Sequence, residues 1–279
     1  MRLGFLGPYG TFSQQAAQMY IQTTAYKDVD FIQYQSIGEL ITAVDHQEVD
    51  EAVVPIENSI EGPVNITLDM LAWDVELKIK REVVVPIEHC LMKKKDSQDI
   101  KEILSHPQAI GQCRKFLSQH FSNVPVHYTS STAEAAQIVT KSKQALAAIA
   151  AKSAAAEYNL EVVYESIQDN KNNVTRFIVL SHEDEIANDY TKTSIIFSTQ
   201  NKPGSLYRVL DILNLWDINM TRIESRPAKY QLGQYIFFVD IEGHREEEDI
   251  KDALKMIQRK TSFFKMLGSY PVLKDKNNI

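Results

Sequence analysis

The sequence predicts an α/β protein with two units, a larger one built around a largely parallel sheet and a smaller ferredoxin-like one. Up to residue 181, apolar runs typical of strands alternate with segments that have helical apolar spacing. After the acidic, polar residues 182–192, the remaining segments follow the order βαββαβ. We therefore expect a first domain over 1–181, a linker over 182–192 with few contacts across it, and a second domain over 193–272.

The first domain is predicted from alternating strand and helix candidates. The strand candidates are residues 3–6, 51–57, 80–92, 145–150 and 172–180. The helix candidates are residues 11–21, 36–44, 63–73, 131–139 and 152–158. Three of these helices open with a hydroxyl residue that is followed three positions later by Gln or Glu, which is the capping-box pattern. The pairs are Thr11 with Gln14, Ser36 with Glu39, and Ser131 with Glu134.

The second domain is predicted from four strand candidates and two helix candidates. The strands are expected at residues 193–199, 218–227, 233–241 and 261–271, and the helices at residues 203–216 and 246–260. Their order along the chain is the reason for expecting a ferredoxin-like unit.

Composition and charge exclude several classes of function. With 44% hydrophobic and 24% charged residues the chain is typical of a globular protein, and its net charge of −7 argues against nucleic-acid or acidic-membrane partners. Neither a membrane-spanning run nor a signal-peptide run is recognisable, so we expect a cytoplasmic protein. Cys90 and Cys113 form no CxxC pair and indicate free thiols in a reducing compartment. The spacing of the seven histidines indicates no metal site, and we expect no cofactor.

Three segments place polar residues at strand ends or helix starts, where an α/β sheet binds its ligands. The segments are "GPYGTFS" with Thr11, Phe12 and Ser13, "PIENSIEGPV" with Glu57, Asn58 and Ser59, and "SHPQAIGQC" with Ser105 and Gln112. Each segment also has a purely structural interpretation: a capped helix, a structural turn, and a helix cap at Ser105.

A fourth segment, "NNVTRFIVL", places Thr175 and Arg176 at the mouth of a predicted strand. An arginine cannot be neutralised, so burying it requires an anionic partner. That partner is either a bound anion or Glu57 in an ion pair within the fold.

Taken in order, these four segments resemble the motifs of the prephenate dehydratase family. The quoted stretches "GPYGTFSQQAA", "VPIENSIEG", "SHPQAIGQC" and "NNVTRFIVL" carry the resemblance. In the second domain, "NKPGSL" and "ESRP" are similar to the two effector-site motifs of an ACT domain, with Ser205 where the family usually has alanine. The resemblance covers nearly the whole chain.

The resemblance implies a fold and a set of site residues. The first domain is expected to form two lobes around a cleft, like a periplasmic solute-binding protein, with the chain returning to the first lobe before Thr175. The catalytic residues map onto Thr175, Asn58, Ser105 and Gln112. The expected substrate contacts are Arg176, Thr11, Phe12, Ser13, Glu57, Ser59 and Phe177. The expected effector contacts are Gly204, Ser205, Leu206, Glu224, Ser225, Arg226 and Pro227.

The implied reaction is the conversion of prephenate to phenylpyruvate with loss of CO2 and water, inhibited by L-phenylalanine in a homodimer or homotetramer. Its barrier lies in the departure of hydroxide, so we expect Thr175 to act as a hydrogen-bond donor, with a relay through Ser105, Asn58 or water. Arg176 is expected to anchor the pyruvyl carboxylate, because a clamp on the departing carboxylate would oppose decarboxylation. Two alternatives stay open: an arogenate dehydratase, and a non-catalytic cytoplasmic amino-acid sensor.

Overall fold

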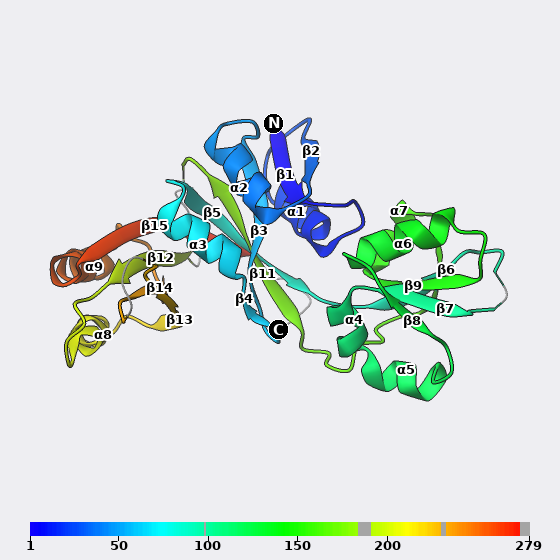
Figure 1. The fold of residues 1–279 in the computed structure, drawn as a ribbon. Helices are drawn as coiled ribbons and strands as arrows, with labels where there is room; N and C mark the ends of the chain where they lie inside the picture. Colours follow the sequence, from blue (N-terminus) through cyan, green and yellow to red (C-terminus); the bar gives the residue numbers. More distant parts are fainter. Residues whose placement is uncertain (98, 184–190, 230–232, 274–279) are drawn as a thin grey trace.

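The computed structural model describes residues 1–97, 99–183, 191–229 and 233–273. They form two α/β lobes and a C-terminal unit (Figure 1). Lobe 1 contains β1 (Arg2–Leu6), α1 (Phe12–Gln22), β2 (Asp30–Tyr34), α2 (Ile37–Asp45), β3 (Glu51–Asn58), β4 (Gly62–Pro63), α3 (Asn65–Trp73), β5 (Lys78–Pro86) and β11 (Val174–Ser181). Lobe 2 contains β6 (Cys90–Lys93), β7 (Glu102–Ser105), α4 (Pro107–Gln112), α5 (Arg114–His120), β8 (Val126–Tyr128), α6 (Thr132–Lys141), β9 (Leu146–Ala150), α7 (Lys152–Glu157) and β10 (Glu161–Tyr164). The C-terminal unit contains β12 (Thr191–Ser198), α8 (Ser205–Leu215), β13 (Met220–Pro227), β14 (Tyr235–Glu242), α9 (Glu248–Lys260) and β15 (Phe263–Leu273).

The predicted helix starts are confirmed by their capping bonds. The hydroxyl oxygens of Thr11, Ser36 and Ser131 each accept a hydrogen bond from the backbone N–H three residues later. These bonds satisfy N–H groups that have no partner within the helix, which fixes where each helix begins.

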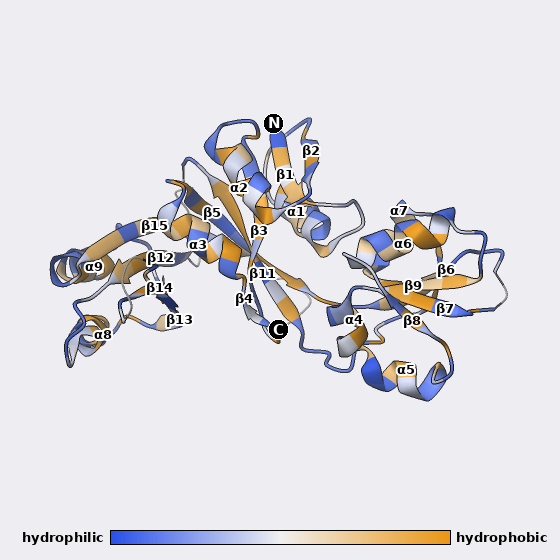
Figure 2. Cartoon of the chain, viewed as in Figure 1, coloured by the Kyte–Doolittle hydropathy of each residue, from blue (hydrophilic) through white to orange (hydrophobic). Residues whose placement is uncertain are grey.

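The sheets are mixed rather than largely parallel, which corrects the expectation from the sequence. In lobe 1, β1 pairs in parallel with β2 and β3, but β11 runs antiparallel to both β3 and β5. In lobe 2, β7 is parallel to β8 and β9, whereas β6 is antiparallel to β9 and β10. The strand β9 is hydrophobic and buried along its whole length (Figure 2).

The predicted long strand over 80–92 is broken between the two lobes. The strand β5 ends at Pro86 in the sheet of lobe 1, and β6 begins at Cys90 in the sheet of lobe 2. Proline has no N–H with which to extend a ladder, whereas the apolar pattern continues across the break. The chain crosses between the lobes here and returns before β11, so the predicted two-lobed arrangement is confirmed.

The C-terminal unit has the predicted βαββαβ order, with α8 and α9 on one face of its sheet (Figure 1). Its other face packs against lobe 1, where Phe238 and Tyr270 share a core with Leu68 and Leu77. In addition, β15 pairs with β5, so one sheet runs through both units. The expectation of few contacts across the polar linker is therefore wrong, because the composition of a linker does not report the apolar face that the next domain presents.

Candidate active site

A cleft of about 380 Å³ lies between the two lobes. Its lining residues come from both lobes and from the two segments that join them. They are Phe12, Asn58, Glu61, Gly62, Pro63, Val64, Ile87, His89, His106, Gln108, Ala109, Gln112, Ser130, Ser131, Thr132, Asn173 and Thr175. Among the residues that the structure describes, no lysine or arginine lines this cleft.

Backbone N–H groups determine which side-chain atom of Asn58 accepts hydrogen bonds and which one donates them, and we call this order of donors and acceptors the polarity of the bonds. Its Oδ1 accepts from the backbone N–H groups of Ile60, at 2.9 Å, and Glu61, at 3.0 Å. The Nδ2 group of Asn58 must therefore be the donor on its other side. It donates to Asn173 Oδ1 at 2.8 Å and to Thr175 Oγ1 at 2.9 Å.

This polarity determines what the Thr175 hydroxyl can do. Since its oxygen already accepts a hydrogen bond from Asn58, its own proton is free to be donated into the cleft that it lines. A hydroxyl that accepts one hydrogen bond also becomes a stronger donor, because hydrogen bonds in a chain polarise one another. The structure thus aims one neutral donor at the space between the lobes.

The same chain of bonds orients Gln112 from lobe 2. Its Oε1 accepts from Asn173 Nδ2 at 3.0 Å and lies 3.0 Å from His89 Nε2. An acceptor at that position requires the proton of a neutral imidazole to be on Nε2. Burial lowers the pKa of His89, and the hydrogen bond to Gln112 opposes the shift only in part, which keeps the ring neutral at neutral pH.

The sequence interpretation missed His89 and Asn173. His89 stands in the apolar run that the structure breaks between β5 and β6, and Asn173 directly precedes β11. A polar residue inside a predicted long strand was the available signal for His89. For Asn173 the signal was its place two residues before Thr175.

Two helix starts line the cleft. The residues just before α3, Gly62 to Val64, lie on the lobe 1 side, and Ser130 to Thr132 at the start of α6 lie on the lobe 2 side. The partial positive charge of a helix N-terminus favours an anion. Ser131 Oγ accepts the capping bond from Glu134 N, so its hydroxyl proton is also free to be donated.

Ser105 does not line the cleft, although it was predicted to be catalytic. Its side chain is fully buried, and its hydroxyl donates to the backbone oxygen of Ile149 at 2.6 Å. The residue that caps α4 is His106, whose Nδ1 accepts from Gln108 N. This geometry opposes a proton relay through Ser105 and gives the side chain a structural role.

Of the predicted substrate contacts, only Phe12 lines the cleft. Thr11 caps α1, Ser13 is buried beneath the helix start, and Phe177 belongs to the core of lobe 1. Ser59 accepts a hydrogen bond from the backbone of Val174, so it holds the turn after β3 to the start of β11. The structural interpretations of these positions fit the geometry.

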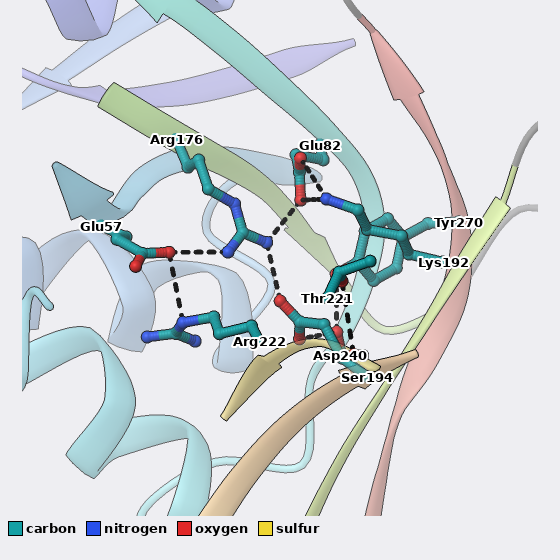
Figure 3. A network of polar contacts seen from close by, with 9 residues as sticks. All are labelled: Glu57, Glu82, Arg176, Lys192, Ser194, Thr221, Arg222, Asp240 and Tyr270. Atoms are coloured by element: carbon teal, nitrogen blue, oxygen red, sulfur yellow. Dashed lines mark hydrogen bonds and ion pairs between the residues drawn. The ribbon is translucent and has the colours of Figure 1, made fainter. Parts of the chain in front are cut away.

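Arg176 also lies away from the cleft, which corrects its predicted role as a substrate anchor. Its guanidinium donates to Glu57 at 2.7 Å, to Glu82 at 2.6 Å and to Asp240 at 2.8 Å (Figure 3). Neighbouring residues of a strand point to opposite faces, so Thr175 faces the cleft and Arg176 faces the C-terminal unit. The ion pair with Glu57, the alternative interpretation, is confirmed.

The predicted effector residues occupy the start of α8 and the strand β13. Gly204 is the N-cap of α8 with a left-handed φ of +76°, and among the described residues no side chain makes a capping hydrogen bond to this helix start. Arg226 on β13 bonds Asp69 and Asn65 of α3. The remaining effector candidates lie beside these two, and their role stays a prediction; they are Leu206, Glu224, Ser225 and Pro227.

Burial raises the pKa of both cysteines, Cys90 and Cys113, and so disfavours the thiolate form of each. Burial raises the pKa of Cys113 to about 12, so its thiol is protonated and unreactive at neutral pH. Over the described ranges, no three His, Cys, Asp or Glu side chains come together in a way that could hold a metal ion. None of the described helices is long and apolar enough to cross a membrane.

Comparisons with known proteins agree on both domains. Residues 3–185 match the family model of prephenate dehydratase, and residues 193–256 match that of the ACT domain. A prephenate dehydratase of Methanocaldococcus jannaschii is 41% identical over 272 residues, which cover 95% of this chain and 96% of that protein. The crystal structure of a prephenate dehydratase from Arthrobacter aurescens in complex with L-Phe is 36% identical, with a TM-score of 0.87 over 97% of this chain and 90% of that one. GqqA, described as a novel type of quorum quenching acylases, is 27% identical, with a TM-score of 0.87 over the full length of both chains.

Proposed function

The chain belongs to the prephenate dehydratase family, and from this premise we propose that it converts prephenate to phenylpyruvate and is inhibited by L-phenylalanine. The observation that supports the chemistry is the hydrogen-bond chain that ends in the free donor of Thr175. In this reaction the ring loses CO2 and a hydroxyl group, and hydroxide is a poor leaving group. A donor placed on that oxygen typically contributes about 10²–10⁴-fold in rate.

Each of the hydrogen-bonded residues Thr175, Asn58 and Gln112 has a separate task in this proposal. Thr175 donates to the departing oxygen but keeps its own proton, because a threonine hydroxyl is a very weak acid. Asn58 fixes the position and polarity of Thr175, while Asn173 holds Gln112 at the cleft from lobe 2, where the Gln112 amide nitrogen lies 3.5 Å from Glu61 Oε1. Because backbone amides anchor Asn58, the donors are in place before the substrate binds, and no reorganisation is needed in the transition state.

The absence of lysine and arginine among the described residues that line the cleft suits a decarboxylation. A cation paired with the ring carboxylate would stabilise the substrate more than the transition state, since the charge leaves that group as CO2 departs. The pyruvyl carboxylate survives in the product and can be held tightly. We assign it to the start of α6, where Ser131 and Thr132 add hydroxyl donors to the helix N-terminus.

One observation favours arogenate as a second candidate substrate. Glu61 is the single carboxylate among the described residues that line the cleft. Arogenate differs from prephenate in carrying an amino group in place of the keto group, and a carboxylate would bind the resulting ammonium. The same carboxylate would repel the dianion prephenate.

Turnover of prephenate and arogenate should be measured side by side, with and without L-phenylalanine, for the natural chain and for Glu61→Gln. We expect phenylpyruvate formation from prephenate, inhibition by L-phenylalanine, and an equal or higher kcat/KM for prephenate in the variant, because the substitution removes the repelling carboxylate. A higher kcat/KM for arogenate that falls in Glu61→Gln would establish the second candidate. Absence of turnover on both substrates would leave the amino-acid sensor as the better account.

Assembly and location complete the proposal. Several large apolar side chains of the C-terminal unit are exposed: Tyr207, Leu215, Ile223 and Tyr235. They lie on α8, on β14 and on the edge strand β13, which suits pairing of two ACT domains in a homodimer or homotetramer. Both cysteines are free and buried, in keeping with an enzyme of the cytoplasm.

A further inference from the structure

Six charged side chains gather behind the strand pair that carries Asn58 and Thr175, and we name them the ionic cluster. Lobe 1 supplies Glu57, Glu82 and Arg176, and the C-terminal unit supplies Lys192, Arg222 and Asp240 (Figure 3). Three positive and three negative charges balance. Each domain contributes charges of both signs, but the three charges of either domain do not sum to zero. Full neutralisation therefore requires both domains.

The ion pairs of this cluster cross the domain boundary at three points. Arg176 of lobe 1 lies 2.8 Å from Asp240, and Glu82 of lobe 1 lies 2.9 Å from Lys192. Arg222 of the C-terminal unit lies 3.2 Å from Glu57.

Asp240 is itself held by its own domain. Its Oδ1 accepts a hydrogen bond from Ser194 at 2.6 Å, and Ser194 is hydrogen-bonded to the hydroxyl of Tyr270. Burial alone would raise the pKa of Asp240, but the charges of Arg176 and Arg222 outweigh burial and lower it, so the carboxylate stays ionised.

The cluster and the active-site residues are neighbours in the chain. On β3, Glu57 precedes Asn58, and on β11, Arg176 follows Thr175. The strand register pairs Thr175 with Asn58 and Arg176 with Glu57. A displacement of either charged side chain therefore pulls on the peptide unit that positions a residue of the cleft.

Burial of the ionic cluster makes the link between the C-terminal unit and the strands β3 and β11 rigid. The side chains of Glu82, Asp240 and Arg222 are only 1%, 5% and 7% exposed. A buried charge that loses its partner is strongly unfavourable, so these side chains stay paired when the domains shift. A rotation of the C-terminal unit is then transmitted to β3 and β11 rather than absorbed at the domain boundary.

We infer that Asp240 and Arg222 are positioning residues of the active site, and that the ionic cluster is the route by which an effector bound to the C-terminal unit acts on Thr175 and Asn58. This inference rests on the proposed function, because it requires an effector that inhibits turnover. It assigns the coupling to one set of ion pairs rather than to the domain boundary as a whole. Other contacts across that boundary, such as those of Lys265, should then matter little for inhibition.

The test compares Asp240→Asn with Lys265→Met in the full chain. Lys265 is also buried and also crosses the boundary, where its ammonium bonds the backbone oxygen of Val75 and the carboxylate of Glu76, two residues between α3 and β5 rather than on β3 or β11. The coupling factor is the ratio of L-phenylalanine dissociation constants, from calorimetry, with and without a saturating unreactive analogue of prephenate. Allosteric coupling factors are typically about 5–150.

We expect the natural chain and Lys265→Met to have similar coupling factors, and Asp240→Asn to have one within about twofold of unity. L-phenylalanine should still bind Asp240→Asn in the absence of the analogue, and Asp240→Glu should restore part of the coupling. If Asp240→Asn does not fold, Arg222→Gln is the second variant, because it leaves Arg176 paired and should lower the factor in the same direction.

Two results would overturn the inference: an unchanged coupling factor in a folded Asp240→Asn or Arg222→Gln variant, or an equal loss of coupling in Lys265→Met. A lower melting temperature with unchanged coupling would give the cluster a structural role only, and this too would contradict the inference. If instead the natural chain turns over prephenate but L-phenylalanine neither binds nor inhibits it, the proposed regulation fails before the inference is tested.

Discussion

The two faces of the strand pair β3 and β11 differ in charge although neighbouring residues build them. The cleft face presents the amides and hydroxyl of Asn58, Asn173 and Thr175, and the opposite face presents the ionic cluster. The proposed substrate carries two negative charges, yet the cleft face offers it neutral donors. The difference teaches that Arg176 and Arg222 join two domains here, whereas the cleft presents oriented neutral groups.

The two faces should therefore respond differently to substitution. A neutral hydrogen bond contributes about 0.5–1.5 kcal/mol to stability, so changes in the cleft cost little folding energy. Removing one partner of a buried ion pair costs about 3–5 kcal/mol, because the remaining charge stays buried. Substitutions on the cleft face should therefore lower the reaction rate with little loss of stability, and substitutions in the ionic cluster should mainly lower stability.

Removal of the C-terminal unit should have the largest effect. A fragment of residues 1–181 exposes the side of lobe 1 that packs against Phe238 and Tyr270, and leaves Arg176 and Glu82 without their partners across the boundary. Every lining residue of the cleft lies before residue 176, so the folded fragment should keep the cleft and part of its turnover, lowered by the loss of Asp240 and Arg222, and should lose inhibition. We expect a much lower melting temperature and dye binding by the exposed apolar surface. An unchanged melting temperature would contradict a shared core.

Thr175→Ala tests the cleft face. We expect kcat to fall by about 10²–10⁴, because the donor acts on the departing oxygen in the transition state, with a smaller change of KM. The melting temperature should change little. Thr175→Ser keeps a hydroxyl with a looser χ1 and should retain part of the activity. Steady-state kinetics of both variants measure these changes of kcat and KM. A near-normal kcat in the alanine variant would remove Thr175 from the mechanism.

Arg176→Met tests the opposite face. We expect a loss of about 3–5 kcal/mol in the free energy of unfolding, because Glu82 and Asp240 remain buried without their shared cation. Denaturant unfolding measures this loss, and KM for prephenate at a temperature where the variant is folded serves as the second readout. A large rise of KM in a variant of normal stability would restore Arg176 as the substrate anchor, against our proposal that the start of α6 binds the pyruvyl carboxylate.

The sequence predicted the parts of this molecule that depend on local chemistry. Capping pairs located three helix starts, the βαββαβ order identified the C-terminal unit, and the motifs placed Asn58, Gln112 and Thr175 correctly at the cleft. Each of these signals lies within a few residues of what it predicts.

The missed features depend on contacts between distant residues. A motif does not show which of two neighbouring strand residues faces the ligand, so Thr175 and Arg176 were both placed at the substrate. The carboxylate that Arg176 meets across the domain boundary belongs to Asp240, 64 positions away. His89 was missed because the apolar pattern around it continues through the crossing between the lobes. Ser105 was wrongly placed at the cleft because no local pattern shows how deeply a side chain is buried.

The smallest expected effect concerns the acid stability of the ionic cluster. The pKa of Asp240 is lowered in the folded protein, because the charges of Arg176 and Arg222 outweigh its burial. A depressed pKa contributes stability that is present above the unfolded value, near 3.9, and is lost as the pH falls through the folded value. Asp240→Asn removes this contribution, so its free energy of unfolding should fall less steeply below about pH 4 than that of the natural chain.

Asp50→Asn is the matched control for the acid limb, by which we mean the fall in the free energy of unfolding below about pH 4. Asp50 also has a lowered pKa, caused first by the hydrogen bond from the backbone N–H of Arg2, but its side chain is 46% exposed and solvent screens its ion pair. Its substitution should flatten the acid limb less than Asp240→Asn does. Urea unfolding at several pH values from 5 to about 2 measures both slopes. Equal slopes for Asp240→Asn and Asp50→Asn would show that the charged face contributes no more to acid stability than an exposed pair does. The two faces would then differ in where their side chains lie but not in what these contribute to acid stability.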